Sequence, residues 1–277
     1  MTFDNIVFAG GGNRCFWQAG FWQALNNEIP QSPTCIASVS AGSAISCALF
    51  SGCFDQVYET TLKVMTDNKK NRYWKNLFKK GLPIHPHNAL YRYIIANSIN
   101  DDGLQVLKQG PENRILVAHI PTWLGPKSAT LVGLTAYQLE KRLFHPVHPK
   151  FGSALGFTSE FRTVQSCQGV SELSDLILSS SCTPPFTPLM YQSGKAVLDG
   201  GMIDNIPFHG VSGNTGKTLI LCSRPYKKFP QHDNTTYVAP SVPVPVKGWD
   251  YTNPGLVKST FLQGKHDAEL FLRQNRI

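Results

Sequence analysis

Three short segments of the chain carry residue types that can do chemistry, and the first is Ser38-Val39-Ser40-Ala41-Gly42. Here a serine lies between a β-prone run and a helical pattern. A nucleophilic serine needs such a sharp strand-to-helix turn, and the residues two before and two after it must be small because strand and helix crowd there. Ser38 and Gly42 are both small, although Ser38 stands where the usual pattern has glycine. Taken alone, Ser40 could equally be a helix N-cap.

The second segment is a glycine cluster, Gly10-Gly11-Gly12-Asn13-Arg14, again between a β-prone run and a helical pattern. Consecutive backbone N–H groups at a helix N-terminus bind negative charge, which can be a phosphate or an oxyanion. The cluster lacks the third glycine of a dinucleotide fingerprint and the G-K-[ST] ending of a phosphate loop. A plain turn and a nucleotide-dependent enzyme both stay open as alternatives at this point.

The third segment is Asp199-Gly200-Gly201, in which an aspartate ends a β-prone run. A buried carboxylate at a strand end can accept the proton of a serine within hydrogen-bond reach. Asp-Gly-Gly is also a common hairpin turn, so the segment alone decides nothing. Together, however, the three segments supply an oxyanion site, a nucleophile and a base, which is the set of groups that acyl transfer needs.

In order and context the three segments resemble the patatin-like phospholipase family. That family has a G-G-G-x-[KR]-G loop near the N-terminus, a G-x-S-x-G turn after it and a distal D-G-[GA]. This chain departs from the pattern at Cys15, which replaces the last glycine of the loop, and at Ser38. The resemblance includes the small-residue and proline run at 179–186 and Asn205-Ile206-Pro207, so it spans roughly 8–207.

The resemblance implies a serine lipid acyl hydrolase of the phospholipase A or lysophospholipase type, without cofactor or metal. Asp199 would take the proton of Ser40, which would attack the ester carbonyl, and Arg14 would order the glycine loop. The residues that the resemblance assigns to oxyanion or substrate binding are Gly10, Gly11, Gly12, Arg14 and Ala41. The departures at Cys15 and Ser38 leave a catalytically weak or silent lipid-binding or regulatory member of the same fold as the alternative.

Histidines offer a different base for the serine. In a serine, acid, histidine order the base would follow Asp199, as His209, His232 and His266 do. His232 lies in a Pro-rich stretch and His266 in a helical pattern, which are ordinary places for surface histidines. Two further pairs have no carboxylate or cysteine at metal-ligand spacing beside them, namely His85 with His87 and His145 with His148.

The elements that must position these segments follow from the apolar pattern. Short β-prone runs at 5–8, 34–39, 115–120 and 218–222 alternate with helical patterns at 15–25, 41–50, 88–97, 137–143, 171–178 and 256–274. This alternation predicts an α/β fold, and with the resemblance a three-layer patatin-like one, in which a mostly parallel central sheet has helices on both faces. We expect a single domain over 1–277, with an irregular Pro-rich segment at 223–255 and a terminal helix at 256–274.

The charge of the chain favours an anionic partner. The formal net charge is +8, and the segment Lys69–Lys80 holds six cations, three aromatic residues and no acid. Such a mixture suits an anionic membrane surface. Single-stranded nucleic acid and an ordinary solvated face are the alternatives. Because the resemblance is to lipid hydrolases, we expect peripheral membrane contact through this segment rather than nucleic acid, and we leave the need for a protein activator open.

Cysteines and apolar runs indicate the compartment. The seven cysteines are scattered, odd in number and form no C-x-x-C pair, which favours reduced thiols over a disulfide framework. The first residues carry no basic region, and no apolar run approaches the roughly 18 residues of a membrane span. We therefore expect a cytoplasmic protein with peripheral membrane association.

Overall fold

The computed structural model describes residues 1–78, 83–121, 123–125, 128–133, 135, 154–184 and 186–275. The helix expected at 137–143 lies outside these residues, as do His145, His148, Lys79 and Lys80. No described helix is both long enough and apolar enough to cross a membrane.

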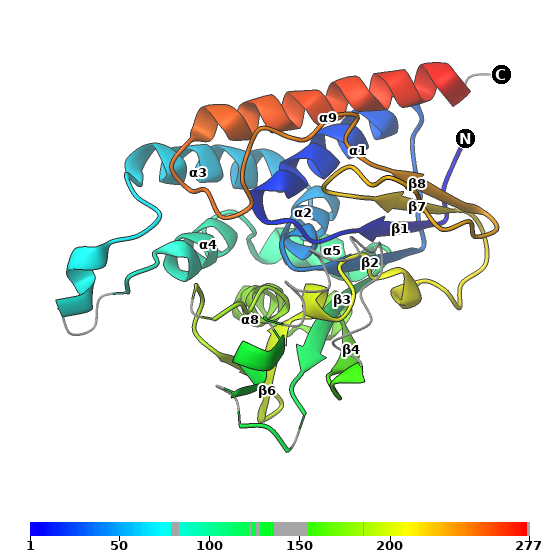
Figure 1. The fold of residues 1–277 in the computed structure, drawn as a ribbon. Coiled ribbons are helices and arrows are strands. Elements are labelled where there is room, and N and C mark those ends of the chain that lie inside the picture. The colour runs from blue at the N-terminus through cyan, green and yellow to red at the C-terminus, as the bar shows by residue number, and fades with distance from the viewer. Residues whose placement is uncertain are drawn as a thin grey trace.

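The described residues form an eight-stranded sheet at the centre of the molecule, with the order β5-β6-β3-β2-β1-β7-β8 and with β4 beside β3 (Figure 1). The strands are β1 Asn5–Phe8, β2 Cys35–Val39, β3 Glu112–His119, β4 Thr158–Thr163, β5 Met190–Gln192, β6 Lys195–Asp199, β7 Thr218–Leu221 and β8 Thr235–Val238. Strands β1, β2, β3, β7 and β8 pair in parallel, whereas β4, β5 and β6 pair antiparallel. The predicted mostly parallel sheet is confirmed, with an antiparallel end that the sequence pattern did not indicate.

Helices alternate with these strands along the chain. The α-helices with printed bounds are α1 Phe16–Glu28, α2 Ala41–Phe50, α3 Phe54–Asp67, α4 His87–Ala96, α5 Asp101–Gln109, α8 Val170–Ser180 and α9 Pro254–Asn275. Short 3-10 helices are η1 Gly12–Cys15, η2 Trp74–Phe78, η3 Val164–Ser166, η4 Gly200–Met202 and η5 Phe208–Gly210. The expected helices among the described residues are all present, and α3 and α5 are additional ones.

The sheet separates two apolar layers, because successive side chains of a strand point to opposite faces. On β1, Ile6 and Phe8 are buried in the large cluster with the α-helices, whereas Val7 belongs to a second cluster on the other face. That second face is covered by η5 and, near β3 and β6, by the helical residues 128–133. The predicted α/β fold with helices on both faces of a sheet is thus confirmed.

One expectation about the Pro-rich segment 223–255 was wrong in part. Its residues Thr235–Val238 form β8, which extends the sheet in parallel beside β7. The residues Thr-Thr-Tyr-Val are β-branched or aromatic, which favours a strand. The run is short, however, and the prolines on either side of it indicate a loop. Pairing with β7 at the edge of the sheet stabilises this short segment, which would not form a strand by itself.

The last helix returns to the core by a close contact with the first one (Figure 1). The backbones of α1 and α9 approach so closely that a Cβ atom on Gly264 would lie 2.1 Å from the carbonyl oxygen of Trp17. The Trp17 indole also donates a 2.7 Å hydrogen bond to the buried carboxylate of Asp267. We propose on these contacts that the chain 1–277 is one domain, which α9 completes.

We predict that Gly264→Ala lowers the free energy of unfolding by about 1–3 kcal/mol, as overpacking commonly does. Alanine normally stabilises a helix interior by about 1 kcal/mol relative to glycine, so a loss would report the close contact with α1. Urea unfolding followed by circular dichroism measures the difference. Gly213→Ala is the matched control, since a Cβ there meets no atom within 4 Å. Equal stability of both variants would contradict the packing argument.

Candidate active site

Ser40 occupies the turn between β2 and α2 in a conformation that non-glycine residues seldom adopt, with φ 54° and ψ −134°. Such strain is stored where the surrounding structure requires it, and functional sites are common examples. The turn is also crowded, since a Cβ atom on Gly42 would lie 2.6 Å from the carbonyl oxygen of Ala9. The backbone therefore leaves no room for a larger residue at Gly42, as expected for a nucleophile turn.

Asp199 reaches Ser40 because β2 and β6 use the same edge of β3. Strand β2 pairs with the first part of β3 and ends with Val39 opposite Leu116. Strand β6 approaches from the other direction and ends with Asp199 opposite Val117, the next residue of β3. The residue that follows Val39 must then meet the last residue of β6. The Ser40 hydroxyl donates a 2.7 Å hydrogen bond to Oδ2 of Asp199.

The Asp199 carboxylate is held on both oxygens. Oδ1 accepts a 2.7 Å hydrogen bond from the N–H of Gly201, and Oδ2 accepts a longer one of 3.4 Å from the Thr183 hydroxyl. Burial disfavours the ionised form and raises the pKa of Asp199 to about 6, although the hydrogen bonds from Ser40, Gly201 and Thr183 oppose the shift. A carboxylate with such a pKa is a stronger base than an ordinary one, and it is still ionised at neutral pH.

The segment after Asp199 is not a hairpin turn. Gly200–Met202 form η4, and the Asp199 side chain caps this short helix through its bond to Gly201. The chain then continues to Asn205, whose backbone and side chain both contact the glycine loop described below. The Asp-Gly-Gly segment therefore fixes the carboxylate rather than reversing the chain.

Ser180 fixes the backbone of the serine turn. The N–H of Ser40 donates a 2.8 Å hydrogen bond to the Ser180 hydroxyl, which in turn donates a 2.6 Å bond to the carbonyl oxygen of Leu116 on β3. Ser180 and Thr183 were not assigned any role from the sequence. Their only signal was the run of small residues at 179–186, in which nothing distinguishes one serine from the next.

The structure corrects the expectation for Gly10. Its N–H donates to the carbonyl oxygen of Asn205 at 3.0 Å, so it cannot serve an oxyanion. Its carbonyl oxygen accepts from the Asn205 amide at 3.1 Å and from the Ser223 hydroxyl at 2.6 Å. Gly10 thus anchors the loop. The N–H groups of Gly11 and Gly12 have no hydrogen-bond partner among the described residues and line the same cavity as Ser40.

The other loop residues hold this arrangement. Arg14 donates a 3.1 Å hydrogen bond from Nε to the carbonyl oxygen of Gly11. Gly12 has a φ of +59°, and a Cβ atom there would lie 2.2 Å from the carbonyl oxygen of Gly248. Cys15, which replaces a glycine of the family pattern, points inward and donates its thiol to the carbonyl oxygen of Ala9. Burial raises the pKa of Cys15 to about 12, so the thiol stays neutral.

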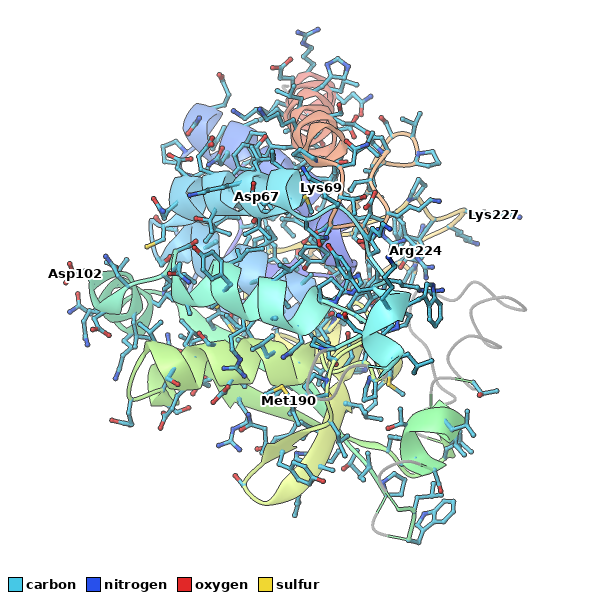
Figure 2. The ribbon with its side chains drawn as sticks, turned by 90° about the vertical axis from the view of Figure 1, so that its left-hand side faces the viewer. Asp67, Lys69, Asp102, Met190, Arg224 and Lys227 are labelled. Atoms are coloured by element: carbon cyan, nitrogen blue, oxygen red, sulfur yellow. The ribbon has the colours of Figure 1, made fainter. Side chains whose placement is uncertain are left out.

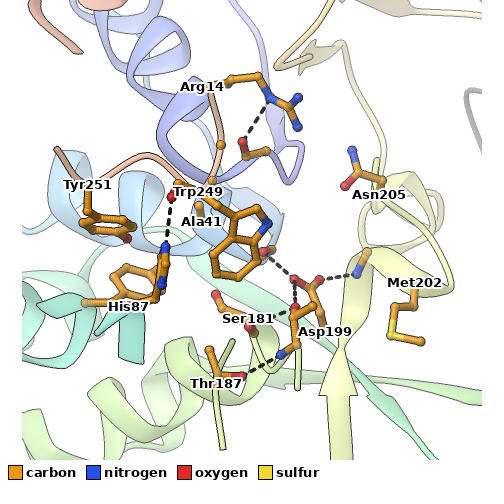
Figure 3. Close-up of a pocket in the computed structure, with 17 residues that line it drawn as sticks. Arg14, Ala41, His87, Ser181, Thr187, Asp199, Met202, Asn205, Trp249 and Tyr251 are labelled. Carbon is orange, nitrogen blue, oxygen red and sulfur yellow. Dashed lines mark hydrogen bonds between the residues drawn. The ribbon is translucent and has the colours of Figure 1, made fainter. Parts of the chain in front are cut away.

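A cavity of about 250 Å³ brings these groups together (Figure 3). Of the residues predicted for the site, all except Gly10 line it, namely Ser40, Asp199, Gly11, Gly12, Arg14 and Ala41. Its remaining wall contains an aromatic group that sequence reasoning missed, formed by Tyr91, Trp249 and Tyr251. These three rings come from α4 and from the Pro-rich segment, which gave no functional signal.

None of the histidines that the structure describes forms a triad with Ser40 and Asp199. Among the described residues the one histidine that lines the cavity is His87, whose Nε2 lies 2.9 Å from the carbonyl oxygen of Trp249. His232 stacks on Phe208 instead, and His266 lies on α9. Within the described part of the chain no three His, Cys, Asp or Glu side chains are grouped as metal ligands would be.

Fold and site together define a class, that of α/β proteins in which a serine after one sheet strand contacts an aspartate at the end of another. Residues 6–212 match the model of the patatin-like phospholipases, and the chain belongs to this family. The solved structure of VipD from Legionella pneumophila has a similar fold, with a TM-score of 0.50 and 12% identity over 98% of this chain and 67% of that chain. No curated protein matches the chain in sequence. Family membership indicates lipid acyl-ester hydrolysis as the general activity.

The raised pKa of Asp199 makes a prediction for stability. Below about pH 4 the carboxyl is protonated in both folded and unfolded chains, whereas above about pH 6 it is ionised in both and the buried charge destabilises the fold. The free energy of unfolding of the wild type, relative to Asp199→Asn, should therefore fall from pH 4 to pH 6 and then remain constant. Chemical denaturation at several pH values measures this, with Asp233→Asn as an exposed control. A difference that rises with pH would refute the assignment.

Proposed function

We propose that the protein is a serine lipid acyl hydrolase of the phospholipase A or lysophospholipase type that works through a Ser40–Asp199 dyad. The observation that carries the proposal is the 2.7 Å hydrogen bond from the strained Ser40 to the Asp199 carboxylate. A nucleophile and base in direct contact need no histidine between them. The pKa of about 6 for Asp199 allows this carboxylate to accept a proton at neutral pH.

The mechanism has two steps. Asp199 accepts the hydroxyl proton while the Ser40 oxygen attacks the ester carbonyl, and the alcohol leaves as the proton is returned to it. Water then attacks the acyl-serine and gives a proton to Asp199, which returns it to the Ser40 oxygen as the fatty acid is released. In both steps we expect the N–H groups of Gly11 and Gly12 to stabilise the oxyanion, together with the backbone N–H of Ala41, the residue after the nucleophile at the start of α2.

A catalytically silent lipid-binding member of the family is the alternative. It was raised because Cys15 and Ser38 depart from the family pattern. Both side chains are buried, and Ser38 contacts Asn113 rather than the cavity. Neither residue displaces Ser40, Asp199 or the two free N–H groups, which supports the active form.

We predict that Ser40→Ala and Asp199→Asn each reduce ester hydrolysis by at least about a thousandfold, because the members of such a dyad act as a unit. A fluorophosphonate probe should label the wild type and not Ser40→Ala. Ser51→Ala, a buried serine just beyond the same helix, is the matched control. Asp199→Asn activity within threefold of the wild type would exclude the dyad, and an unlabelled, inactive wild type would favour the silent alternative.

The contact with a membrane is the second part of the proposal, and it uses the described part of the basic aromatic segment, 69–77. Here Trp74 and Leu77 are each 61% exposed, and Lys69, Lys70, Arg72 and Lys75 are exposed around them. Figure 2 shows Lys69 just after α3. Amphipathic rings among cations suit the headgroup layer of an anionic bilayer.

The basic aromatic segment is tied to the wall of the cavity. The Asn71 amide donates to Asp250 at 2.9 Å and accepts from the N–H of Tyr251 at 2.9 Å. Tyr251 and Trp249 line the cavity, and Trp249 is 39% exposed. Docking through this segment would therefore bring the cavity that contains Ser40 to the lipid surface, where the ester bonds of a bilayer lie.

We predict that replacing Lys69, Lys70, Arg72 and Lys75 with Gln weakens binding to anionic vesicles by up to about 4 kcal/mol at low salt, at about 1 kcal/mol per cation. The difference should shrink as salt rises, because screening shortens the reach of exposed charges to about 8 Å at physiological ionic strength. Cosedimentation with phosphatidylserine vesicles measures binding, and hydrolysis of vesicle lipid should fall relative to that of a soluble ester.

A control removes the same charge from other elements. It carries Gln at four exposed lysines, Lys195, Lys217, Lys228 and Lys258. If both quadruple variants lose vesicle binding equally, net charge rather than the basic aromatic segment is responsible. If neither loses binding, the docking surface lies elsewhere.

A further inference from the structure

A second cavity lies against the one that contains Ser40. It is narrow, about 40 Å³, and the two cavities share the walls formed by Gly12, Ala41, Tyr91 and Tyr251. Two of these residues belong to the site itself, since Gly12 carries an unpaired N–H group and Ala41 follows the nucleophile. The second cavity thus begins where the carbonyl group of a substrate would lie.

The lining of the second cavity is mainly apolar. It lies between α1, α2, α3 and α4. Asn13, Thr61 and the two tyrosines Tyr91 and Tyr251 are the lining residues with a polar group, and the other side chains that line it are apolar. Most of these side chains are at most 5% exposed, namely Phe16, Ile45, Val57, Ile94, Ile95 and Ile99. None of the described residues that line it is charged, so neither an ionic headgroup nor a phosphate would be stabilised there.

The residues around Ser40 also differ in polarity between the two cavities. Asp199, Thr183 and Asn205 line the first cavity alone, whereas Ala41 and Gly12 face both cavities. An acyl ester has a polar alcohol part and an apolar acyl part on opposite sides of its carbonyl carbon. Hydrocarbon is stabilised where it leaves water for an apolar environment. The acyl part would therefore extend past Ala41, and the alcohol part would remain in the larger cavity, which contains the polar side chains of Asp199, Thr183 and Asn205.

We propose that the second cavity binds the fatty-acyl chain of the substrate and that its small volume makes short and medium chains the preferred ones. This inference rests on the proposed Ser40 chemistry and assigns the acyl side of that same site. Longer chains fit only if the isoleucines of α2 and α4 move apart.

Tyr91 and Tyr251 are the two aromatic residues that line both cavities. Burial raises the pKa of both phenols well above the ordinary value, so both side chains are uncharged at neutral pH. The shared walls therefore add no charge that would oppose the entry of hydrocarbon.

The test is the chain-length profile of hydrolysis, measured with p-nitrophenyl acetate, butyrate, octanoate and palmitate. Each methylene that is buried contributes about a fourfold gain in affinity or kcat/KM. Ala44→Phe places a ring in the second cavity, and we expect the octanoate-to-acetate ratio of kcat/KM to fall by about tenfold or more. The wild type should prefer butyrate or octanoate to palmitate.

A variant that enlarges the second cavity distinguishes a change in chain-length preference from a simple loss of folding in Ala44→Phe. Ile95→Ala enlarges the cavity and should raise the palmitate-to-butyrate ratio. Ile177→Ala on α8 is the matched control, because this isoleucine is fully buried and lines neither cavity. Unchanged profiles in both cavity variants, or the same shift in Ile177→Ala, would overturn the proposal.

A binding measurement separates this inference from the proposed function. In a Ser40→Ala background, calorimetry with octanoate should show weaker binding when Ala44→Phe is added, whether or not Ser40 is the nucleophile. Hydrolysis that survives Ser40→Ala would refute the proposed chemistry. Hydrolysis that depends on Ser40, together with equal octanoate affinity with and without Ala44→Phe, would refute the acyl cavity alone.

Discussion

The rest of the site depends on one junction in the sheet, where β2 and β6 meet end to end along β3. Because β2 runs parallel to β3 and β6 antiparallel, the last residue of β6 and the residue after β2 arrive at the same point. Ser40 and Asp199 are 159 residues apart in the chain, yet the register of two strands on a third fixes their contact. Shifting either strand by one residue would also turn its side chains to the other face.

The junction holds two unfavourable features, a strained serine and a buried carboxylate, and the surrounding contacts are arranged to offset them. Ser180 ties the backbone of Ser40 to β3, and Gly201 donates to the Asp199 carboxylate. Asn205 then connects the strand end to the glycine loop by bonds to both the carbonyl and the N–H of Gly10. These hydrogen bonds join the chain segments that meet at the junction. The same contacts therefore stabilise both the fold and the site.

Local patterns predicted much of this arrangement, because a strand, a sharp turn and a helix within one stretch leave a signature in the sequence. The β2–Ser40–α2 unit and the glycine loop were found in this way. The antiparallel β6, the strand β8 and the occupied N–H of Gly10 were not, since each depends on a partner far along the chain. Ser180, Thr183 and the aromatic wall were missed for the same reason: their residue types are ordinary, and only tertiary contacts give them a role.

The departures from the family pattern can now be placed relative to the chemistry. Cys15 packs inward behind the glycine loop, and Ser38 lies beneath the serine turn, so both alter the support of the loop and turn rather than the groups that face a substrate. The residues that line the two cavities divide instead between a larger one of mixed polarity and a smaller, mainly apolar one, and Ala41 and Gly12 line both. If an ester carbonyl lies at that boundary, the proposed acyl cavity takes the hydrocarbon on one side, and the same few residues that would activate the ester would also set its orientation.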